Sequence, residues 1–235
     1  MKMTFALGAA ALASMLGAGA AHADDHSGVS VSAGAGLVEG DITYSGGKPA
    51  AALSSAMADL RVGFDWQFGE ESGPVIGASY TRSIGDGVTA PANRDGNYLV
   101  QGATLDGYDI IEGRLGWAFG RFMPYAGYGQ LKRDGEVSQS CPNDPAAAPF
   151  GFCSGGGNPA TAAARAGRTA GELDGSAGLV RVGIEVNVTP NVFVDLSYAE
   201  ASFDRETVRY ANAAIPATDP EQEVKLFGLR VGARF

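Results

Sequence analysis

Several stretches of the chain alternate apolar and polar residues one for one. The alternation is clearest in ADLRVGFDWQF, IEGRLGWAF, LVRVGIEVNVT, NVFVDLSY and VKLFGLRVGARF. A period of two places successive side chains on opposite faces of a β-strand, so these stretches predict strands with one apolar face. Three weaker stretches, residues 28–44, 74–84 and 122–133, raise the predicted number of strands to eight, although the faces of the last are not assigned.

The connections between these strands alternate in length. Three of them are tight turns, at residues 69–73, 120–121 and 189–191. Four are long and rich in Gly, Ala, Pro and charge, at residues 45–56, 85–104, 134–172 and 201–222. Short turns at one end and long loops at the other are typical of membrane β-barrels. The sequence therefore predicts an all-β protein, an eight-stranded antiparallel up-and-down transmembrane β-barrel.

The first residues, MKMTFALGAAALASMLGAGAAHADD, have the layout of a secretory signal peptide. Lys2 is followed by an apolar segment, residues 5–16, and by the A-x-A site at residues 21–23. A membrane anchor is the alternative. We expect three segments: a signal peptide at 1–23, an N-terminal stub at 24–27 and the barrel at 28–235. The rest of the chain has no apolar run near the roughly 18–20 residues of a spanning helix.

The two faces of the predicted strands distinguish a membrane barrel from a soluble one. The polar face carries a set of charges: Arg61, Asp65, Glu112, Arg114, Arg181, Glu185, Asp195, Arg230 and Arg234. The apolar face carries aromatic residues near both strand ends. Trp66, Phe68, Trp117, Phe119 and Phe235 lie toward the short turns, and Tyr44, Tyr80, Tyr108 and Tyr198 toward the long loops. Two aromatic girdles fit two lipid–water interfaces, so we place the apolar face against lipid.

The charged face then points into a narrow interior. Eight strands leave only enough room for side chains, and small neighbours such as Gly63, Gly116, Gly183, Gly228 and Gly232 make space for long ones. The nine charges comprise five arginines and four acids. Buried charges need partners, so we predict a salt-bridged plug rather than an open pore.

Chemistry-bearing residues are few. The chain has two histidines, of which His22 is expected to leave with the signal peptide and His26 lies in the stub. We therefore expect no catalytic, cofactor-binding or metal-binding residues, and no enzymatic activity. The acids of the predicted interior could be general acid/base groups, but arginine partners are the favoured interpretation. The net charge of −9 disfavours binding to nucleic acid.

The two cysteines, Cys141 and Cys153, lie in the longest loop. An exported cysteine pair meets an oxidising compartment, so we expect a disulfide, worth about 3 kcal/mol to the loop. Two free thiols are the alternative.

With its A-x-A signal, its eight strands, GRFMPYAGYG and the ending VKLFGLRVGARF, the chain resembles the small eight-stranded outer-membrane β-barrel proteins of Gram-negative bacteria. Opacity-type surface proteins and OmpA-like barrel domains are familiar members. The resemblance implies that Phe227, Leu229, Val231 and Phe235 form the insertion signal that the barrel-assembly machinery reads. Unlike two-domain OmpA-like proteins, the chain is expected to have no peptidoglycan-binding domain.

The expected function is that of a non-enzymatic outer-membrane β-barrel. It would support envelope integrity or adhesion through its extracellular loops, as a surface antigen of the broad porin family. Expected partners are outer-membrane lipid, the assembly machinery, and host or surface ligands of the loops. A small channel or porin-like transporter is one alternative, and a periplasmic ligand-binding barrel is another.

Overall fold

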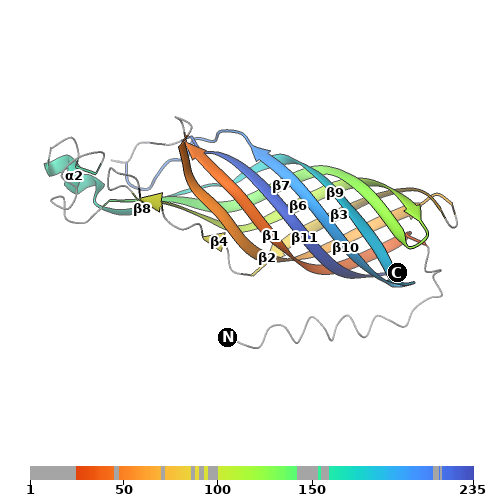
Figure 1. Cartoon of the computed structure of the whole chain (residues 1–235). Helices are drawn as coiled ribbons and strands as arrows, with labels where there is room; N and C mark the ends of the chain where they lie inside the picture. The colour runs from red at the N-terminus through yellow and green to blue at the C-terminus, as the bar shows by residue number, and fades with distance from the viewer. Residues whose placement is uncertain are drawn as a thin grey trace, which may run out of the picture.

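The fold is given by a computed structural model. It describes residues 25–44, 48–69, 72–85, 88–89, 93–94, 100–141, 153–154, 159–213, 217 and 219–235. The expected signal peptide lies outside the described residues. The chain forms a closed, antiparallel eight-stranded barrel (Figure 1), which confirms the predicted fold class.

The eight barrel strands are β1 (Gly28–Tyr44), β2 (Lys48–Gln67), β3 (Ser72–Ile84), β6 (Val100–Phe119), β7 (Phe122–Cys141), β9 (Gly175–Thr189), β10 (Val192–Phe203) and β11 (Glu221–Arg234). Each pairs with its neighbours along the chain, and β1 pairs with β11 to close the wall. Short strands β4 (Val88–Thr89) and β5 (Asn93–Arg94) pair with β6, and β8 (Gly167–Glu172) pairs with β7. Helix α2 (Pro159–Arg165) lies at the end opposite the C-terminus (Figure 1).

Several strands extend further at their long-loop ends than the sequence predicts. Strands β2, β6 and β7 have 20 residues each. They include residues 48–56, 100–104 and 134–141, all of which were expected to be loop. The residues of these segments still alternate between the two faces, but here the apolar residues face inward: Leu105 and Val137 are buried inside the barrel. Since their outward neighbours are small or polar, the pattern has little contrast.

The barrel therefore consists of two halves with opposite polarity. In the turn half (residues 29–37, 59–68, 74–80, 111–119, 122–128, 180–188, 192–198 and 227–235), most of the large apolar side chains are exposed and the charges are buried. In the loop half (38–44, 48–58, 81–84, 100–110, 129–141, 175–179, 199–203 and 221–226), the buried cluster is apolar and includes Ile42, Leu131 and Leu179. Segments of about nine residues fit one crossing of the hydrocarbon layer by a tilted strand. The turn half is thus the membrane-spanning part.

Candidate functional site

Nearest the short turns, four buried side chains form the turn-end cluster. Its members are Asp65, Arg114, Glu185 and Arg234, from four different strands. The Arg114 Nε donates to Asp65 Oδ1 at 2.6 Å, and its Nη2 lies 3.2 Å from Glu185 Oε2. The Arg234 Nη2 donates to Glu185 Oε1 and lies 3.5 Å from Asp65 Oδ2. Each carboxylate is shared by two guanidinium groups, so the cluster ties opposite walls together.

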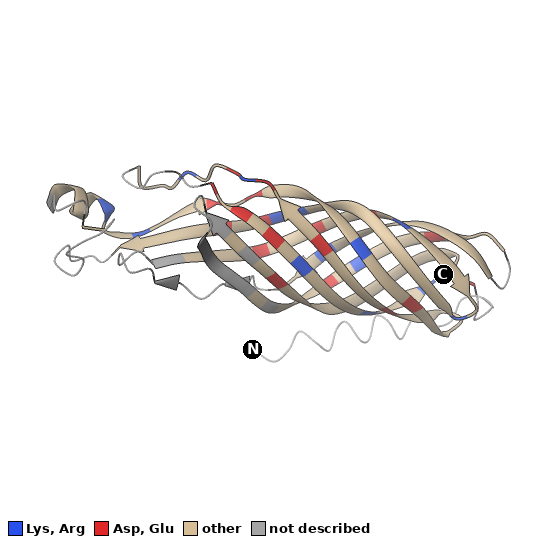
Figure 2. Ribbon diagram, turned by 45° about the horizontal axis from the view of Figure 1, so that its top comes forward, with Lys and Arg blue, Asp and Glu red and all other residues tan. Residues whose placement is uncertain are grey.

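Farther from the turns lies the mid-barrel cluster, composed of Asp59, Arg61, Glu112, Arg181, Asp195 and Arg230. Glu112 accepts from Arg181 Nε at 2.7 Å and lies 3.2 Å from Arg61 Nη2. Arg230 bridges Asp59, at 2.8 Å, and Asp195, at 3.3 Å. Tyr125 joins the two clusters, because its hydroxyl donates to Asp195 at 2.6 Å and its ring centre lies 5.1 Å from the Arg114 guanidinium carbon. Charged positions of both signs are interspersed along the barrel strands (Figure 2).

All nine charges singled out in the sequence lie in these clusters, together with one that was missed. Asp59 is buried and pairs with Arg230, which gives five acids for five arginines. Its position two residues before Arg61 puts it on the same strand face, so the alternation was sufficient to find it. Equal numbers of opposite charges keep the interior neutral, as burial at low dielectric requires.

His26 occupies the mouth of the barrel at the turn end. It is fully buried, and its ring nitrogens lie 3.1 Å from Glu185 Oε1 and 3.0 Å from the Gly120 carbonyl oxygen. Its main-chain N–H donates to Gln67 Oε1 at 3.0 Å. Gly28 makes the fold-back possible with a φ of 127°, a conformation that side chains with a Cβ rarely adopt. His26 is thus part of the barrel interior.

The interior of the loop half is apolar and closed by residues 204–212, which follow β10. Val208 and Tyr210 of this segment are buried in the apolar cluster. Tyr210 accepts a hydrogen bond from Gln139 at 3.0 Å. The backbone N–H of Ala211 donates to the Ala170 carbonyl of β8 at 3.1 Å. We call residues 204–212 the cap segment.

Arg133 is the charged side chain buried in the described part of the loop half. Its guanidinium carbon lies 3.9 Å from the centre of the Phe203 ring, and Nη2 lies 3.6 Å from Glu206 Oε2. Burial lowers the pKa of Arg133 to about 10, although the nearby Glu206 charge opposes this shift. Sequence reasoning missed Arg133 because the faces of its strand were not assigned.

Apart from Tyr44 and Tyr108, the aromatic residues predicted for the girdles lie on the outside of the turn half. Near the turns, the ring centres of Trp66 and Phe68 are 6.4 Å apart, and those of Trp117 and Phe119 are 6.3 Å apart. At the other edge of the apolar surface, the Tyr80 hydroxyl donates to Asp109 at 2.6 Å and the Tyr198 hydroxyl donates to Glu200 at 2.5 Å. Amphipathic rings with wet hydroxyls suit a lipid–water interface.

Tyr108 does not belong to the outer girdle, so that prediction was wrong. It is buried inside the barrel, where its hydroxyl donates to Asp59 Oδ2 at 3.1 Å. Tyr108 is an even number of residues before Glu112 and Arg114 on β6, so it lies on the same inward face as they do. Burial also raises the pKa of Tyr108 above its ordinary value. The side chain of Tyr44 lies outside the described residues.

The residues expected to form the insertion signal share the outer face of one wall. Phe227, Leu229, Val231 and Phe235 are all exposed along β11 and at its end. Phe235 also helps to close the barrel, since its N–H donates to the Val29 carbonyl at 2.9 Å. Arg230 and Arg234, which lie between these residues in the sequence, point inward and belong to the charged clusters.

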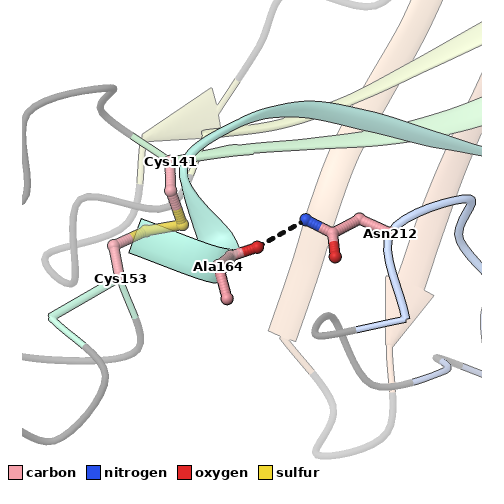
Figure 3. The surroundings of a disulfide bond; sticks show 4 residues. All are labelled: Cys141, Cys153, Ala164 and Asn212. Carbon is pink, nitrogen blue, oxygen red and sulfur yellow. Dashed lines mark hydrogen bonds between the residues drawn. A yellow bond between two sulfur atoms is a disulfide. The ribbon is translucent and has the colours of Figure 1, made fainter. Parts of the chain in front are cut away.

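The disulfide expected between Cys141 and Cys153 is present, with a Cα–Cα distance of 5.5 Å. It links the end of β7 to the segment before α2 (Figure 3). The Asn212 side chain donates to the Ala164 carbonyl of α2 at 2.8 Å, which fixes the cap segment to the helix (Figure 3). The disulfide, α2 and cap segment together form the tip of the loop half.

Within the described residues, no group of three His, Cys, Asp or Glu side chains is placed to hold a metal ion. A polar hollow on the outer wall is lined by Arg82, Asp106, Asp109 and Asp134, among others. Arg82 pairs there with Asp109 at 3.9 Å. No helix in the described part of the chain has the length and apolar character to cross a membrane.

Comparison with known proteins adds a family match. The family described as "Outer membrane protein beta-barrel domain" matches residues 8–235. No curated protein sequence matches the chain.

Solved structures similar to this chain include three bacterial proteins. Ail, the attachment invasion locus protein of Yersinia pestis, is 13% identical, with 89% of this chain and 99% of that chain covered and a TM-score of 0.43. Neisserial surface protein A is 15% identical, with coverage of 89% and 98% and a TM-score of 0.42. The outer membrane protease OmpT from Escherichia coli is 12% identical, with coverage of 88% and 97% and a TM-score of 0.41. Similarity at this level transfers no activity or ligand to the chain.

Proposed function

The chain belongs to the outer membrane protein β-barrel family, and on that premise we propose that it is a non-enzymatic surface protein of the Gram-negative outer membrane. In such barrels the short turns face the periplasm, so the loop half projects from the cell. The observation that carries the proposal is the balanced set of ion pairs in the turn half, which fills the interior with side chains. A filled barrel with a long, disulfide-linked tip suits envelope support and contact with other surfaces.

A test separates these two roles. Cells that lack the protein would be complemented with the wild type or with a variant in which a short Gly/Ser linker replaces residues 142–166. We expect both proteins to restore resistance to detergent, because both keep the barrel. Only the wild type should restore adhesion to immobilised host or environmental surfaces. Equal adhesion by the two complemented strains would contradict a role for the tip.

The non-enzymatic part of the proposal is supported by the state of the titratable side chains. His26 is buried, and both of its ring nitrogens lie against acceptors. The inward carboxylates Asp65, Glu112 and Glu185 each lie within 3.2 Å of an arginine nitrogen. Groups held in this way are poorly placed to exchange protons with a substrate. We accordingly propose no catalytic residue, cofactor or metal.

A second candidate function is that of a narrow channel, which one observation favours. Two buried guanidinium nitrogens of the clusters, Arg114 Nη1 and Arg181 Nη2, have no hydrogen-bond partner. Unsatisfied donors are costly in a dry interior. Conductance of the purified protein in planar bilayers decides between the candidates. We expect a silent wild type, and steady single-channel currents would favour the channel.

We further propose that the protein is exported through cleavage of residues 1–23 and inserted by the barrel-assembly machinery. The outward row of Phe227, Leu229, Val231 and Phe235 supports this, because it offers one apolar strand face. Deletion of Phe235 should leave export intact and reduce the fraction of heat-modifiable, folded barrel. Wild-type insertion of the deletion variant would argue against this signal.

A further inference from the structure

Arg133 retains unused capacity to bind an acceptor. Only 1% of the residue is exposed, and the aromatic ring of Phe203 covers the guanidinium at 3.9 Å. Nη1 donates to Gln222 Oε1, but the buried Nε has no partner. Leu131 and Val224, neighbours of Arg133 and Gln222 along the inner wall, are buried and apolar. A buried cation in such surroundings favours an anionic partner strongly, because water does not compete for it.

The carboxylate that now faces Arg133 is weakly held. Glu206 Oε2 lies 3.6 Å from Nη2, and 44% of the Glu206 side chain is exposed. The mid-barrel pair of Arg230 and Asp59 is different, since two guanidinium nitrogens contact the carboxylate at 2.8 and 2.9 Å and both side chains are buried. A partly hydrated carboxylate loses little when it returns to water. Glu206 is therefore a counter-ion that another carboxylate can replace.

The cap segment presents this carboxylate together with apolar groups. Val208 and Tyr210, two and four residues after Glu206, are buried in the apolar cluster of the loop half. The segment is bonded to β8 by hydrogen bonds that include Ala211 N–H to Ala170 O at 3.1 Å and Asn212 N–H to Thr169 Oγ1 at 3.0 Å. One end of the segment supplies a negative charge to Arg133, and the rest supplies apolar surface to the interior.

We propose that the loop half contains a binding site for an amphipathic anion of the long-chain carboxylate class, and that the cap segment occupies this site in the unliganded protein. The carboxylate of the ligand binds Arg133 in place of Glu206. Its hydrocarbon chain takes the volume that Val208 and Tyr210 fill, among Leu131, Leu173 and Phe203. Binding requires the cap segment to move outward, away from β8. The site lies inside the barrel, whereas adhesion is proposed for the tip, and the cap segment belongs to both.

The test uses the full-length protein in lipid nanodiscs and a dansyl-labelled undecanoate as the probe. We expect saturable binding to the wild type above the background of empty nanodiscs. Glu206→Gln should bind the probe about tenfold more tightly, because it removes the competing charge. Arg133→Gln should bind it about tenfold more weakly than the wild type, and Arg133→Lys should recover part of the loss. Dodecanol, which lacks the charge, should compete equally in all variants.

A further variant tests the cap segment without touching the charges. A Cβ at Gly171 would overlap Val208 Cγ1 and lie 2.8 Å from the Arg209 carbonyl oxygen. Gly171→Ala should therefore loosen the cap segment and tighten probe binding, with faster hydrogen exchange at Ala211 and Asn212. Arg205→Gln is the matched control, because Arg205 pairs with Glu221 on the exposed surface at 3.3 Å.

Heat-modifiable gel migration verifies that each variant is folded. Unchanged probe affinity in Arg133→Gln would overturn the proposal, since the probe would then only partition into lipid. Weaker binding to Glu206→Gln would also overturn it, because Glu206 would then be part of the site rather than its occupant. The control should behave as the wild type.

Discussion

The turn half and the loop half are built on the same eight strands but place their apolar side chains on opposite faces of the wall. Along β11, Phe227 and Leu229 point outward in the turn half, while Arg230 points inward. A few residues away in the loop half, Lys225 points outward and Val224 inward. The strand geometry is unchanged across this boundary. The medium outside the wall, lipid or water, decides which face carries apolar side chains.

The two interiors are also held together by different forces. The turn half depends on charge pairing, and a charge left alone there is surrounded by protein and lipid. The loop half depends on close packing of apolar side chains, as a soluble protein does. Removing one member of a pair and removing one apolar side chain should therefore have different consequences, which the following variants measure.

The largest expected effect is the loss of a mid-barrel arginine. Arg230→Met leaves Asp59 and Asp195 without this partner in a buried setting, and should lower the free energy of unfolding by about 3–5 kcal/mol. Arg133→Met is the comparison, because its counter-ion Glu206 can return to water. We expect it to change the free energy by less than about 1 kcal/mol or to stabilise the protein. Urea titration in detergent or lipid measures both, and equal losses would erase the distinction between the halves.

Next comes a packing defect in the loop half. Leu179→Ala removes a fully buried side chain from the apolar cluster and should lower the free energy of unfolding by about 2–5 kcal/mol. Ser176→Ala, an exposed position on the same strand, should have almost no effect. Hydrogen exchange should show the loss first in the loop half. A uniform increase of exchange in both halves would indicate that they form a single cooperative core.

The outer face gives a third comparison, on one strand. Val231→Lys places a charge near the middle of the lipid-facing segment of β11 and should cost about 2–4 kcal/mol. Lys225→Val changes the same face of the same strand where it is in water, and should cost less than about 1 kcal/mol. Unfolding titrations in lipid vesicles supply both values. A small cost at Val231 would mean that lipid does not surround this part of the wall.

The smallest effect is expected at the disulfide. Replacing Cys141 and Cys153 by serine should change the free energy of unfolding of the barrel by less than about 0.5 kcal/mol, because the bridge closes a local loop of 12-residue separation. Hydrogen exchange in α2 and β8 should nevertheless rise. A large loss of barrel stability would show that the tip and the barrel unfold together.

The sequence predicts the turn half better than the loop half for a physical reason. In the turn half, outward Val, Leu, Phe and Trp alternate with inward charges, so the sequence of each strand distinguishes its two faces. In the loop half the outward residues are small or polar, such as Ser54, Ala56 and Thr104, and the same alternation has little contrast. Inward residues such as Val137 therefore looked like part of a loop.

The sequence predicts most members of the two charged clusters, but it does not predict how the two ends of the barrel interior are closed, by His26 at one end and by the cap segment at the other. Asp59 follows from the phase of its strand and was simply overlooked. The seat of His26 depends on Gly28 turning the stub back toward Gln67 and Glu185, far away in the sequence. The contact between Arg133 and Glu206 likewise depends on where the cap segment settles. Local patterns do not encode such contacts.

The change of polarity along each strand also sets how deeply the protein sits in the bilayer. If the barrel rose by one pair of residues, about 6–7 Å along a strand, Phe227 and Tyr128 would leave the hydrocarbon together with their counterparts on the other strands. If it sank by the same distance, Lys225, Glu200 and Gln130 would enter it. Each displacement is opposed by every strand at once. The vertical position of the barrel is therefore fixed to within one residue pair, and its tip is held at a constant height above the membrane.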